Sequence, residues 1–375
     1  MDDRYQYQDQ QGYEPYAPPL GPPPPPPQQQ HYYGGYQGYD NQGYAPPPGP
    51  PPTQREVYQQ QDAQGHVAEQ SFEYSRCNGK KKALLIGINY FGSDAELGGC
   101  INDVYNVHAF ICGRFGYDPA DCVILTDDKQ DPRSYPTKDN IIRAMAWLVD
   151  GAQRDDALFF HYSGHGTQVE DVDGDEHDDD DEAICPVDFQ QAGLIIDDDS
   201  AHDLLVKPLP AGCRLTAIFD SCHSGTVMDL PYAYTVEGNI KKPNLFEGTQ
   251  SHLLDAGMGV LTGNTGNLFS GLFRAAQEAF ENHQSQEMTV KTKTSPADVI
   301  QWAGCKDSQT SADTQEAGKA TGAMSYAFIA SLSKYPDQSY QQLLETVREE
   351  MKGKYSQVPQ LSACHPIDTS LQFVA

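Results

Sequence analysis

The stretches ALFFHYSGHGTQ, residues 157–168, and LTAIFDSCHSGT, residues 215–226, decide the fold of this chain. Each begins as an apolar run of strand length and ends in a polar tip with glycines, as buried parallel strands do at the edge of an open sheet. The first tip carries His165 and the second carries Cys222. A thiol ionises near neutral pH only beside a base or a cation, and one Cys with a distant His is typical of that pairing. We therefore predict a reactive site at His165 and Cys222.

The residues around the two tips support this prediction and also offer rivals. Gly225 permits a sharp turn after Cys222, and backbone N–H groups in such a turn could hold an oxyanion. His161 lies inside the strand and should point into the fold, whereas His223 adjoins the thiol in sequence and should point away from it. His165, flanked by glycines, is therefore the preferred base. The alternative for Cys222 is a buried inert thiol, the commonest fate of cysteine.

The rest of the sequence alternates strand and helix patterns. Apolar runs predict six main strands at 83–88, 121–126, 156–162, 214–220, 297–303 and 360–363, and a short edge strand at 194–196. Helical spacing predicts helices at 100–112, 137–150, 203–206, 323–332 and 339–352. This spacing is typical of βαβ units. We expect an α/β fold with a mainly parallel six-stranded sheet flanked by helices, and a long connection from about 239 to 294.

The amino-terminal part has a different composition. Residues 1–60 hold 15 of the 27 prolines and 10 of the 22 tyrosines, with very few aliphatic side chains. Such a segment cannot bury enough apolar area to offset its ordering entropy. We predict a disordered Pro/Gln/Tyr-rich tail over residues 1–75, able to self-associate or to bind aggregates, and one folded domain over residues 80–375. A solvated spacer without a partner is the alternative for the tail.

Charge and cysteine usage exclude several classes of protein. The net charge of −28 argues against nucleic acid as a partner and favours cations. No apolar run approaches the roughly 20 residues of a membrane helix, so we expect no membrane partner and a cytoplasmic or nuclear location. The nine cysteines include no CxxC pair. They predict reduced thiols, without a disulfide framework or a zinc site.

Several motifs resemble the metacaspases, caspase-fold cysteine peptidases of fungi, plants and protozoa. YSGHG at 162–166 and DSCHSG at 220–225 look like the His and Cys boxes of that family, and KKALLIGINY, GCINDV, DEAICPVDF and CKDSQTSADT are similar to it as well. The resemblance runs from about residue 80 to the carboxyl end, and the tail without zinc-finger cysteines resembles the fungal type I members. It implies a caspase-like peptidase domain with a large-subunit-like part to about residue 293 and a small-subunit-like part after it. It also implies Cys222 as nucleophile and His165 as general base.

The resemblance further implies cleavage after Lys or Arg. Asp220, two residues before the thiol, and Asp103, in the first turn of a predicted helix, are carboxylates that a basic side chain bound beside Cys222 could reach. Paired carboxylates recognise a guanidinium by forked hydrogen bonds and an ammonium by charge. Cys100 and Ser163 resemble the remaining substrate-binding residues. The alternative for Asp103 is a helix-capping or surface carboxylate.

Ten of the thirteen residues from Glu170 to Glu182 are acidic, and Asp197 to Asp199 add three more. A generic acidic loop is the simplest interpretation, and an EF-hand starting at Asp171 is rejected because its glycine stands at the fourth place and not the sixth. The resemblance instead implies an activating Ca²⁺, outside the chemistry itself, at Asp181, Asp198, Asp199 and Asp229, with Asp180 a rival for Asp181.

We thus expect a calcium-dependent cysteine endopeptidase made as a self-processing zymogen, acting on protein substrates with exposed Lys or Arg. Autoprocessing is expected after Lys291 or Lys293, as exposed lysines in the long connection. The family suggests a role in regulated cell death and in stress or aggregate clearance. The alternatives are a nonenzymatic aggregate-handling scaffold driven by the tail, and a caspase-fold peptidase of other specificity, such as Asn or Asp.

Overall fold

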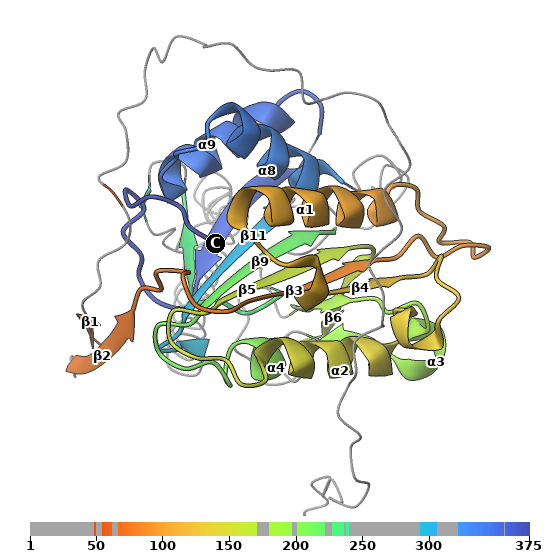
Figure 1. The fold of residues 1–375 in the computed structure, drawn as a ribbon, viewed down its shortest axis with the longest axis horizontal. Coiled ribbons are helices and arrows are strands. Elements are labelled where there is room, and N and C mark those ends of the chain that lie inside the picture. Colours follow the sequence, from red (N-terminus) through yellow and green to blue (C-terminus); the bar gives the residue numbers. More distant parts are fainter. Residues whose placement is uncertain are drawn as a thin grey trace, which may run out of the picture.

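A seven-stranded sheet forms the centre of the computed structural model, with helices on both faces (Figure 1). The structure describes residues 49, 55–61, 67–170, 180–196, 201–221, 227–235, 238–239, 293–305, 322–355 and 357–375. Residues 1–48, which make up most of the predicted tail, and residues 240–292 of the predicted long connection lie outside the described residues.

The strand order of the main sheet is β10-β12-β11-β9-β5-β3-β4. Its strands are β3 (Lys81–Gly87), β4 (Cys122–Thr126), β5 (Ala157–Ser163), β9 (Arg214–Asp220), β10 (Tyr232–Tyr234), β11 (Asp298–Cys305) and β12 (Val358–Ala363). Strands β4, β3, β5, β9 and β11 are parallel, and β12 and β10 add two antiparallel neighbours. The mainly parallel α/β sheet is confirmed, with one strand more than the six expected because β10 pairs onto β12.

The two central strands explain why the helices cover both faces. Every residue of β5 and β9 is buried, which is typical of parallel strands with helices on either side. Alternate residues of β5 face opposite layers, so that Phe159 packs in one apolar core and Phe160 in the other. One face carries α1 (Cys100–Phe115), α8 (Ala323–Lys334) and α9 (Tyr340–Met351); the other carries α2 (Lys138–Val149), α3 (Phe189–Ala192) and α4 (Asp203–Leu205) (Figure 1). Short 3-10 turns lie at Pro119–Asp121 and Pro132–Ser134.

A second, three-stranded sheet follows β5 in the chain. It consists of β6 (Gly166–Glu170), β7 (Asp180–Ile184) and β8 (Ile195–Ile196), all antiparallel. The short strand predicted at 194–196 therefore exists, but it belongs to this small sheet and not to the main one. The cause is local, because β7 turns back on β6 and offers β8 a free edge.

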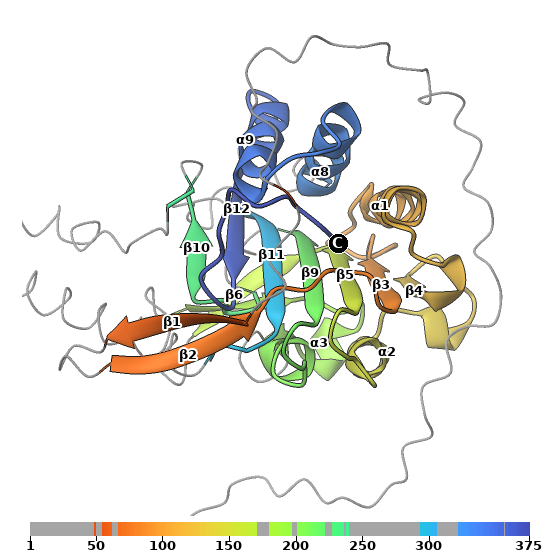
Figure 2. The same cartoon turned by 60° about the vertical axis from the view of Figure 1, so that its left-hand side comes forward.

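The amino-terminal flank of the domain contains a hairpin of β1 (Arg55–Gln61) and β2 (Val67–Glu73) (Figure 2). Phe72 near the end of β2 is buried, as are Tyr74, Ser75 and Cys77 directly after the hairpin. The predicted tail boundary at residue 75 thus falls inside a segment that packs on the domain, because a few apolar side chains at 72–77 are enough to hold it there.

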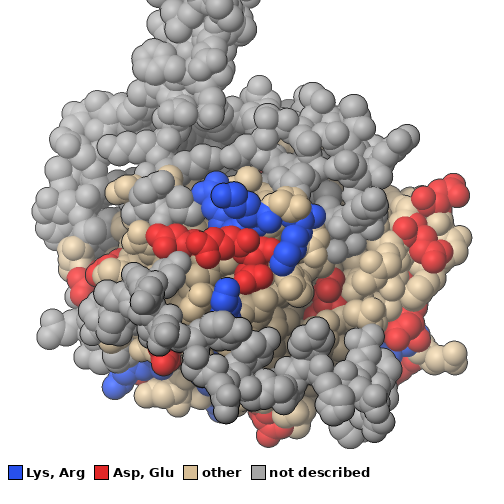
Figure 3. All heavy atoms as spheres, turned by 90° about the horizontal axis from the view of Figure 1, so that it is seen from above, with Lys and Arg blue, Asp and Glu red and all other residues tan. Residues whose placement is uncertain are grey.

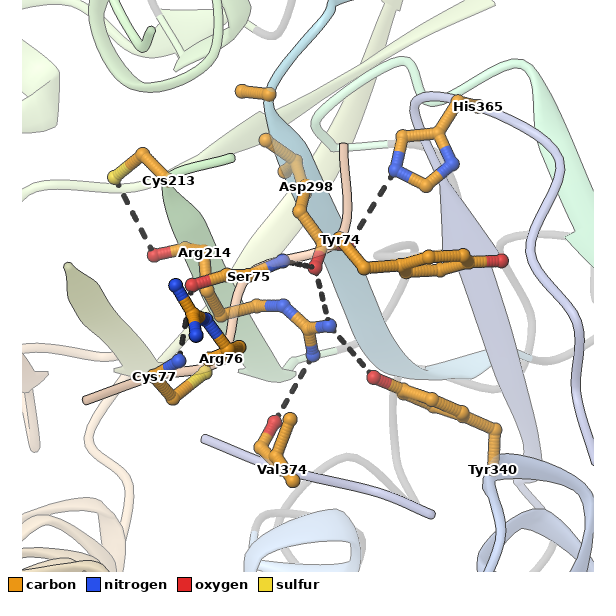
Figure 4. Close-up of polar contacts among 12 residues, drawn as sticks. Tyr74, Ser75, Arg76, Cys77, Cys213, Arg214, Asp298, Tyr340, His365 and Val374 are labelled. Carbon is orange, nitrogen blue, oxygen red and sulfur yellow. Dashed lines mark hydrogen bonds and ion pairs between the residues drawn. The ribbon is translucent and has the colours of Figure 1, made fainter. Parts of the chain in front are cut away.

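A buried polar cluster lies at the amino ends of β9 and β11, where this segment packs on the sheet (Figure 4). Arg214 and Asp298 are both fully buried and form an ion pair with 2.6 Å between Nη2 and Oδ2. The same carboxylate oxygen accepts a hydrogen bond from the Ser75 N–H at 2.9 Å, and Arg214 donates to the Tyr340 hydroxyl at 2.7 Å. Burial alone would raise the pKa of Asp298, but Arg214 and His365 hold it below its usual range. The cluster links the amino-terminal segment to β9, β11 and α9.

Acidic and basic side chains lie next to one another in a patch on the face of the molecule seen in Figure 3. Lys334 and Lys354 both lie near Glu350, at 3.7 and 3.5 Å. Partly exposed pairs of this kind contribute little to stability. Among the described helices, none combines the length and the apolar character required to span a bilayer.

Candidate active site

His165 follows β5 at the carboxyl edge of the main sheet, between two glycines. Its Nε2 lies 2.8 Å from the backbone carbonyl oxygen of Ala95. A carbonyl oxygen only accepts hydrogen bonds, so Nε2 must carry the hydrogen, which leaves Nδ1 as the basic nitrogen of the neutral ring. In the neutral ring, Nδ1 is therefore the nitrogen that could accept a proton, as a general base must. Sequence reasoning missed Ala95, because a backbone carbonyl leaves no signal in side-chain identity.

Two buried tyrosines hold the backbone of His165. The His165 N–H donates to the Tyr90 hydroxyl at 3.0 Å, and the Tyr162 hydroxyl donates to the His165 carbonyl at 2.7 Å. Burial raises the pKa of both tyrosines, so both hydroxyls remain protonated donors. A Cβ at Gly164 would lie 2.7 Å from the Tyr162 hydroxyl, so only glycine fits there. Tyr90, which follows β3, was not predicted from the sequence as a residue of the site.

His161, the rival base inside β5, does not reach this edge. It is fully buried, and its Nε2 lies 2.8 Å from Ser325 Oγ. Burial lowers its pKa to about 3, so the ring stays neutral across the physiological range. The expectation that it points into the fold is confirmed, and His165 stays the preferred base.

Cys222 and His223 lie outside the described residues. The strand register nevertheless places Asp220, two residues before Cys222, close to the segment that carries His165. Ser163 at the end of β5 pairs directly with Asp220 at the end of β9. His165 stands two residues beyond Ser163, and Cys222 stands two residues beyond Asp220. The two strands therefore deliver the chain leading to both predicted catalytic residues at neighbouring points of one edge.

The four predicted substrate-binding residues are brought together at the same edge. Asp103 Oδ2 accepts a hydrogen bond from Ser163 Oγ at 3.1 Å. Cys100 is buried one turn earlier on α1. Burial, with a smaller contribution from the charges of Asp103 and Asp220, raises the pKa of its thiol to about 12. Asp220 is almost fully buried next to Ser163 in the strand register. Asp103 lies half-buried in the first turn of α1, where no side chain caps the helix, and its carboxylate contacts Ser163.

Asp220 also forms hydrogen bonds with the amino end of α8, a contact that the sequence did not predict. Its carboxylate accepts from the backbone N–H groups of Gly322, Met324 and Ser325 at 3.2, 3.3 and 2.7 Å. Three N–H donors stabilise its ionised form. Burial nevertheless raises the pKa of Asp220, as it does that of Asp103, which also lies close to the Asp220 charge and rises to about 8. Because Asp220 has the donors, the proton of the pair rests on Asp103.

Of the predicted calcium ligands, Asp229 is the one whose side chain is described. It is buried, and its Oδ2 lies 2.7 Å from Nζ of Lys293, which is itself 9% exposed. Its backbone has a positive φ of 51°, a conformation that non-glycine residues seldom adopt. Asp181 lies in β7 without a described side chain, and Asp198, Asp199 and the processing candidate Lys291 lie outside the described residues.

Lys293 was expected to be an exposed lysine, and this expectation is wrong. Its backbone follows the long connection, but its ammonium is buried against the Asp229 carboxylate. The reason is electrostatic, since a buried carboxylate requires a cation or a set of donors. Sequence position alone gave no sign of this partner, 64 residues earlier in the chain.

Comparisons with known proteins agree with the motifs. The family profile described as "Metacaspase, peptidase C14 domain" matches residues 81–231. The chain is 60% identical over 311 residues to "Metacaspase-1" of Cryptococcus neoformans, covering 83% of this chain and 68% of that protein. It is 56% identical over 310 residues to "Metacaspase-1" of Pyricularia oryzae, covering 83% and 78%. It is 55% identical over 312 residues to "Metacaspase-1A" of Aspergillus clavatus, covering 83% and 72%.

Proposed function

The chain belongs to the metacaspase family of cysteine peptidases, in its fungal type I group, and on this premise we propose a calcium-dependent endopeptidase that cleaves after Lys or Arg and is made as a self-processing zymogen. The observation that supports the specificity is a pair of neighbouring carboxylates, the half-buried Asp103 and the buried Asp220, at the edge that holds His165.

The catalytic steps follow from the placement of His165. Its Nδ1 takes the proton of the Cys222 thiol, and the thiolate sulfur bonds to the substrate carbonyl carbon. Backbone N–H groups in the turn after β9 are the proposed holders of the resulting oxyanion. When the C–N bond breaks, His165 returns the proton to the leaving amine. Water then attacks the thioester, restores the thiol and releases the carboxylate product.

The acidic pair accounts for the proposed specificity. Within the part of the chain that the structure describes, no Lys or Arg pairs with Asp103 or Asp220. Two neighbouring carboxylates that are withdrawn from water and have no cation disfavour full ionisation, and burial together with the Asp220 charge raises the pKa of Asp103. A substrate Lys or Arg would supply the missing charge, and Arg could form forked hydrogen bonds as well. A substrate Asp would bring a second negative charge next to that of Asp220, so a caspase-like preference for Asp is disfavoured.

Calcium is proposed to bind at Asp181, Asp198, Asp199 and Asp229, which would supply hard oxygen ligands. Two observations support this set. Asp229 is a buried carboxylate that already requires a cation, and β8 runs antiparallel to β7, so that its end at Ile196 lies toward the strand end that carries Asp181. When bound, the ion would fix loops beside the active site. It is not proposed to take part in bond making.

Processing is proposed after Lys291 or Lys293, in the connection before β11. The ion pair gives Lys293 a second role, because its ammonium contacts the Asp229 carboxylate that is proposed to bind calcium. Calcium binding at Asp229 would release Lys293, and a released lysine could then enter a site specific for basic residues. Charge exchange at one carboxylate would thus couple calcium to processing.

The remaining expectations from the family are also proposals. They comprise a role in regulated cell death and stress or aggregate clearance, a cytoplasmic or nuclear location, protein substrates with exposed basic residues, and self-association through residues 1–75. Neither a membrane nor nucleic acid is proposed as a partner.

The deciding experiment measures cleavage of fluorogenic peptides that differ only in the residue before the scissile bond, as Arg, Asn or Asp, with and without calcium. We expect cleavage of the Arg peptide only with calcium, and its loss in Cys222→Ala. Cleavage of the Asn or Asp peptide in preference to Arg would favour a peptidase of other specificity. Absence of all cleavage by well-folded protein would favour the nonenzymatic scaffold.

A further inference from the structure

Three soft ligand side chains converge far from the active site. His108 and Cys112 stand one turn apart on α1, and Cys122 begins β4. One ligand atom from each lies within 4.8 Å of the other two, and His108 Nε2 lies 3.6 Å from Cys112 Sγ. Cys112 is nine residues beyond Asp103, about 13 Å along the helix. The cluster is therefore separate from the substrate pocket at the other end of α1.

The separations suit a tetrahedral metal ion. Zinc binds Cys sulfur at about 2.3 Å and His nitrogen at about 2.0–2.1 Å, which places neighbouring ligand atoms about 3.5–3.8 Å apart. The His108–Cys112 distance already falls in this range. The remaining separations, below 4.8 Å, need only small side-chain movements. A disulfide between the two cysteines would use the sulfurs alone and would leave the direction of the His108 nitrogen unexplained.

The surroundings of the cluster are compatible with a metal ion. His108 is buried, and Cys112 and Cys122 are partly buried, so the three ligand atoms are largely withdrawn from water. Cys122 Sγ also lies 3.3 Å from the Asp118 carbonyl oxygen. Metal binding would release the protons of both thiols, because a thiolate is the form of cysteine that binds zinc.

We propose that His108, Cys112 and Cys122 bind a thiophilic d¹⁰ dication, Zn²⁺, with a water molecule as the fourth ligand. Cys112 and Cys122 are both partly exposed, so solvent can reach that position. The ion would tie the carboxyl half of α1 to β4, the outermost parallel strand of the sheet. The site escapes a search for CxxC pairs, because two ligands share a helix face and the third stands ten residues later.

The test uses the full chain with Cys222→Ala, purified reduced and free of metal, so that the proposed nucleophile cannot bind the probe. Co²⁺ is titrated, and thiolate-to-cobalt charge-transfer absorption is recorded before and after Zn²⁺ is added. We expect one Co²⁺ per chain in a thiolate environment, displaced by Zn²⁺. Adding Cys112→Ser or Cys122→Ser should at least halve the charge-transfer band, and His108→Gln should weaken Co²⁺ binding at least tenfold. Cys185→Ser, a buried thiol outside the cluster, is the matched control and should leave the band unchanged.

A second measurement avoids dependence on the folding of the serine variants. Zn²⁺ should slow alkylation of Cys112 and Cys122 in the Cys222→Ala chain, read by peptide mass spectrometry, but not alkylation of Cys77 or Cys185. The proposal is overturned if the folded chain shows no charge-transfer band with Co²⁺, or if Cys112→Ser retains the full band. It is equally overturned if Cys112 and Cys122 form a disulfide in the presence of Zn²⁺, which would make them a redox pair.

Discussion

The ammonium of Lys293 lies 2.7 Å from the carboxylate of Asp229, and both side chains are almost completely buried. An ion pair removed from water resists the loss of either partner, because the remaining charge is then buried alone. The proposed binding of calcium at Asp229 would therefore be a competition between two cations. This relationship leads to the first two predictions.

Removing the lysine should strengthen calcium binding. In a Cys222→Ala background, Lys293→Gln should lower the melting temperature without calcium, because Asp229 loses its counter-ion. It should also bind calcium at least tenfold more tightly, about 1.4 kcal/mol, by isothermal titration calorimetry. Lys207→Gln, which removes an exposed lysine paired with Asp203, is the control and should change neither value. Equal calcium affinity in Lys293→Gln and the control would contradict the exchange.

Processing in calcium should create new amino termini at Thr292 or Thr294, after Lys291 or Lys293. A site specific for basic residues would accept either lysine once it leaves its partner. Amino-terminal sequencing of the fragments provides the measurement. Lys293→Gln should abolish the Thr294 end and leave the Thr292 end. Fragments that begin only elsewhere in the chain would refute this choice of sites.

Substrate specificity should depend on both pocket carboxylates. Asp220→Asn should reduce kcat/KM for an Arg peptide at least 100-fold, since a buried cation without its partner costs several kcal/mol, on the order of 3–5. Asp103→Asn should act in the same direction. Ser331→Ala, a buried polar change on α8 away from the pocket, is a suitable control. An Arg peptide cleaved equally well by Asp220→Asn would remove the acidic pair from the specificity site.

The same pair should make stability depend on pH. The pKa of Asp103 rises to about 8 on folding, mainly through burial, from about 3.9 in the unfolded chain. The stabilisation from its bound proton is complete below pH 4 and is lost as the pH rises toward 8. Asp103→Asn does not titrate, so its melting temperature relative to wild type should increase from pH 5 to pH 8, by about 2–4 °C for each kcal/mol. The measurement is made on peptide-free protein. A constant difference across this range would contradict the raised pKa.

Part of this site was accessible from the sequence because strand ends and helix turns are local patterns. The apolar runs before His165 and Asp220 indicated parallel strands, and parallel strands place their carboxyl ends at one edge. The spacing of Val104 and Val107 on a helix placed Asp103 nearby. These three residues indeed lie at one edge.

Other features depend on contacts that no local pattern records. The Ala95 carbonyl that orients His165 is a backbone group, and Lys293 is buried only because Asp229 lies next to it. Strand β10, Tyr232–Tyr234, is three residues long and too short for a period-two pattern. The packing of Phe72 depended on a carboxyl-terminal partner that the tail composition could not indicate.

That partner is His365, and it gives a last prediction about where the folded domain begins. Phe72 stacks on the His365 ring with 3.6 Å between centroids, and the Ser75 N–H donates to the buried Asp298 carboxylate. The Tyr74 hydroxyl accepts from the Asp368 N–H at 2.8 Å. A chain that begins at residue 71 keeps these contacts, whereas one that begins at residue 79 loses all of them.

The chain that begins at residue 71 should melt close to the full-length protein, and the one that begins at 79 should melt far below it. Burial of Phe72 contributes about 1.5–3 kcal/mol, and leaving a buried acceptor short of its donor costs about 1–3 kcal/mol. At about 2–4 °C for each kcal/mol, the loss is at least about 5 °C. Phe72→Ala in the full-length chain isolates the stacking contribution and should give part of this loss. If the two truncated chains melt within 2 °C of each other, residues 71–78 are only a tether, because the polar cluster around Arg214 and Asp298 would then be stable without them.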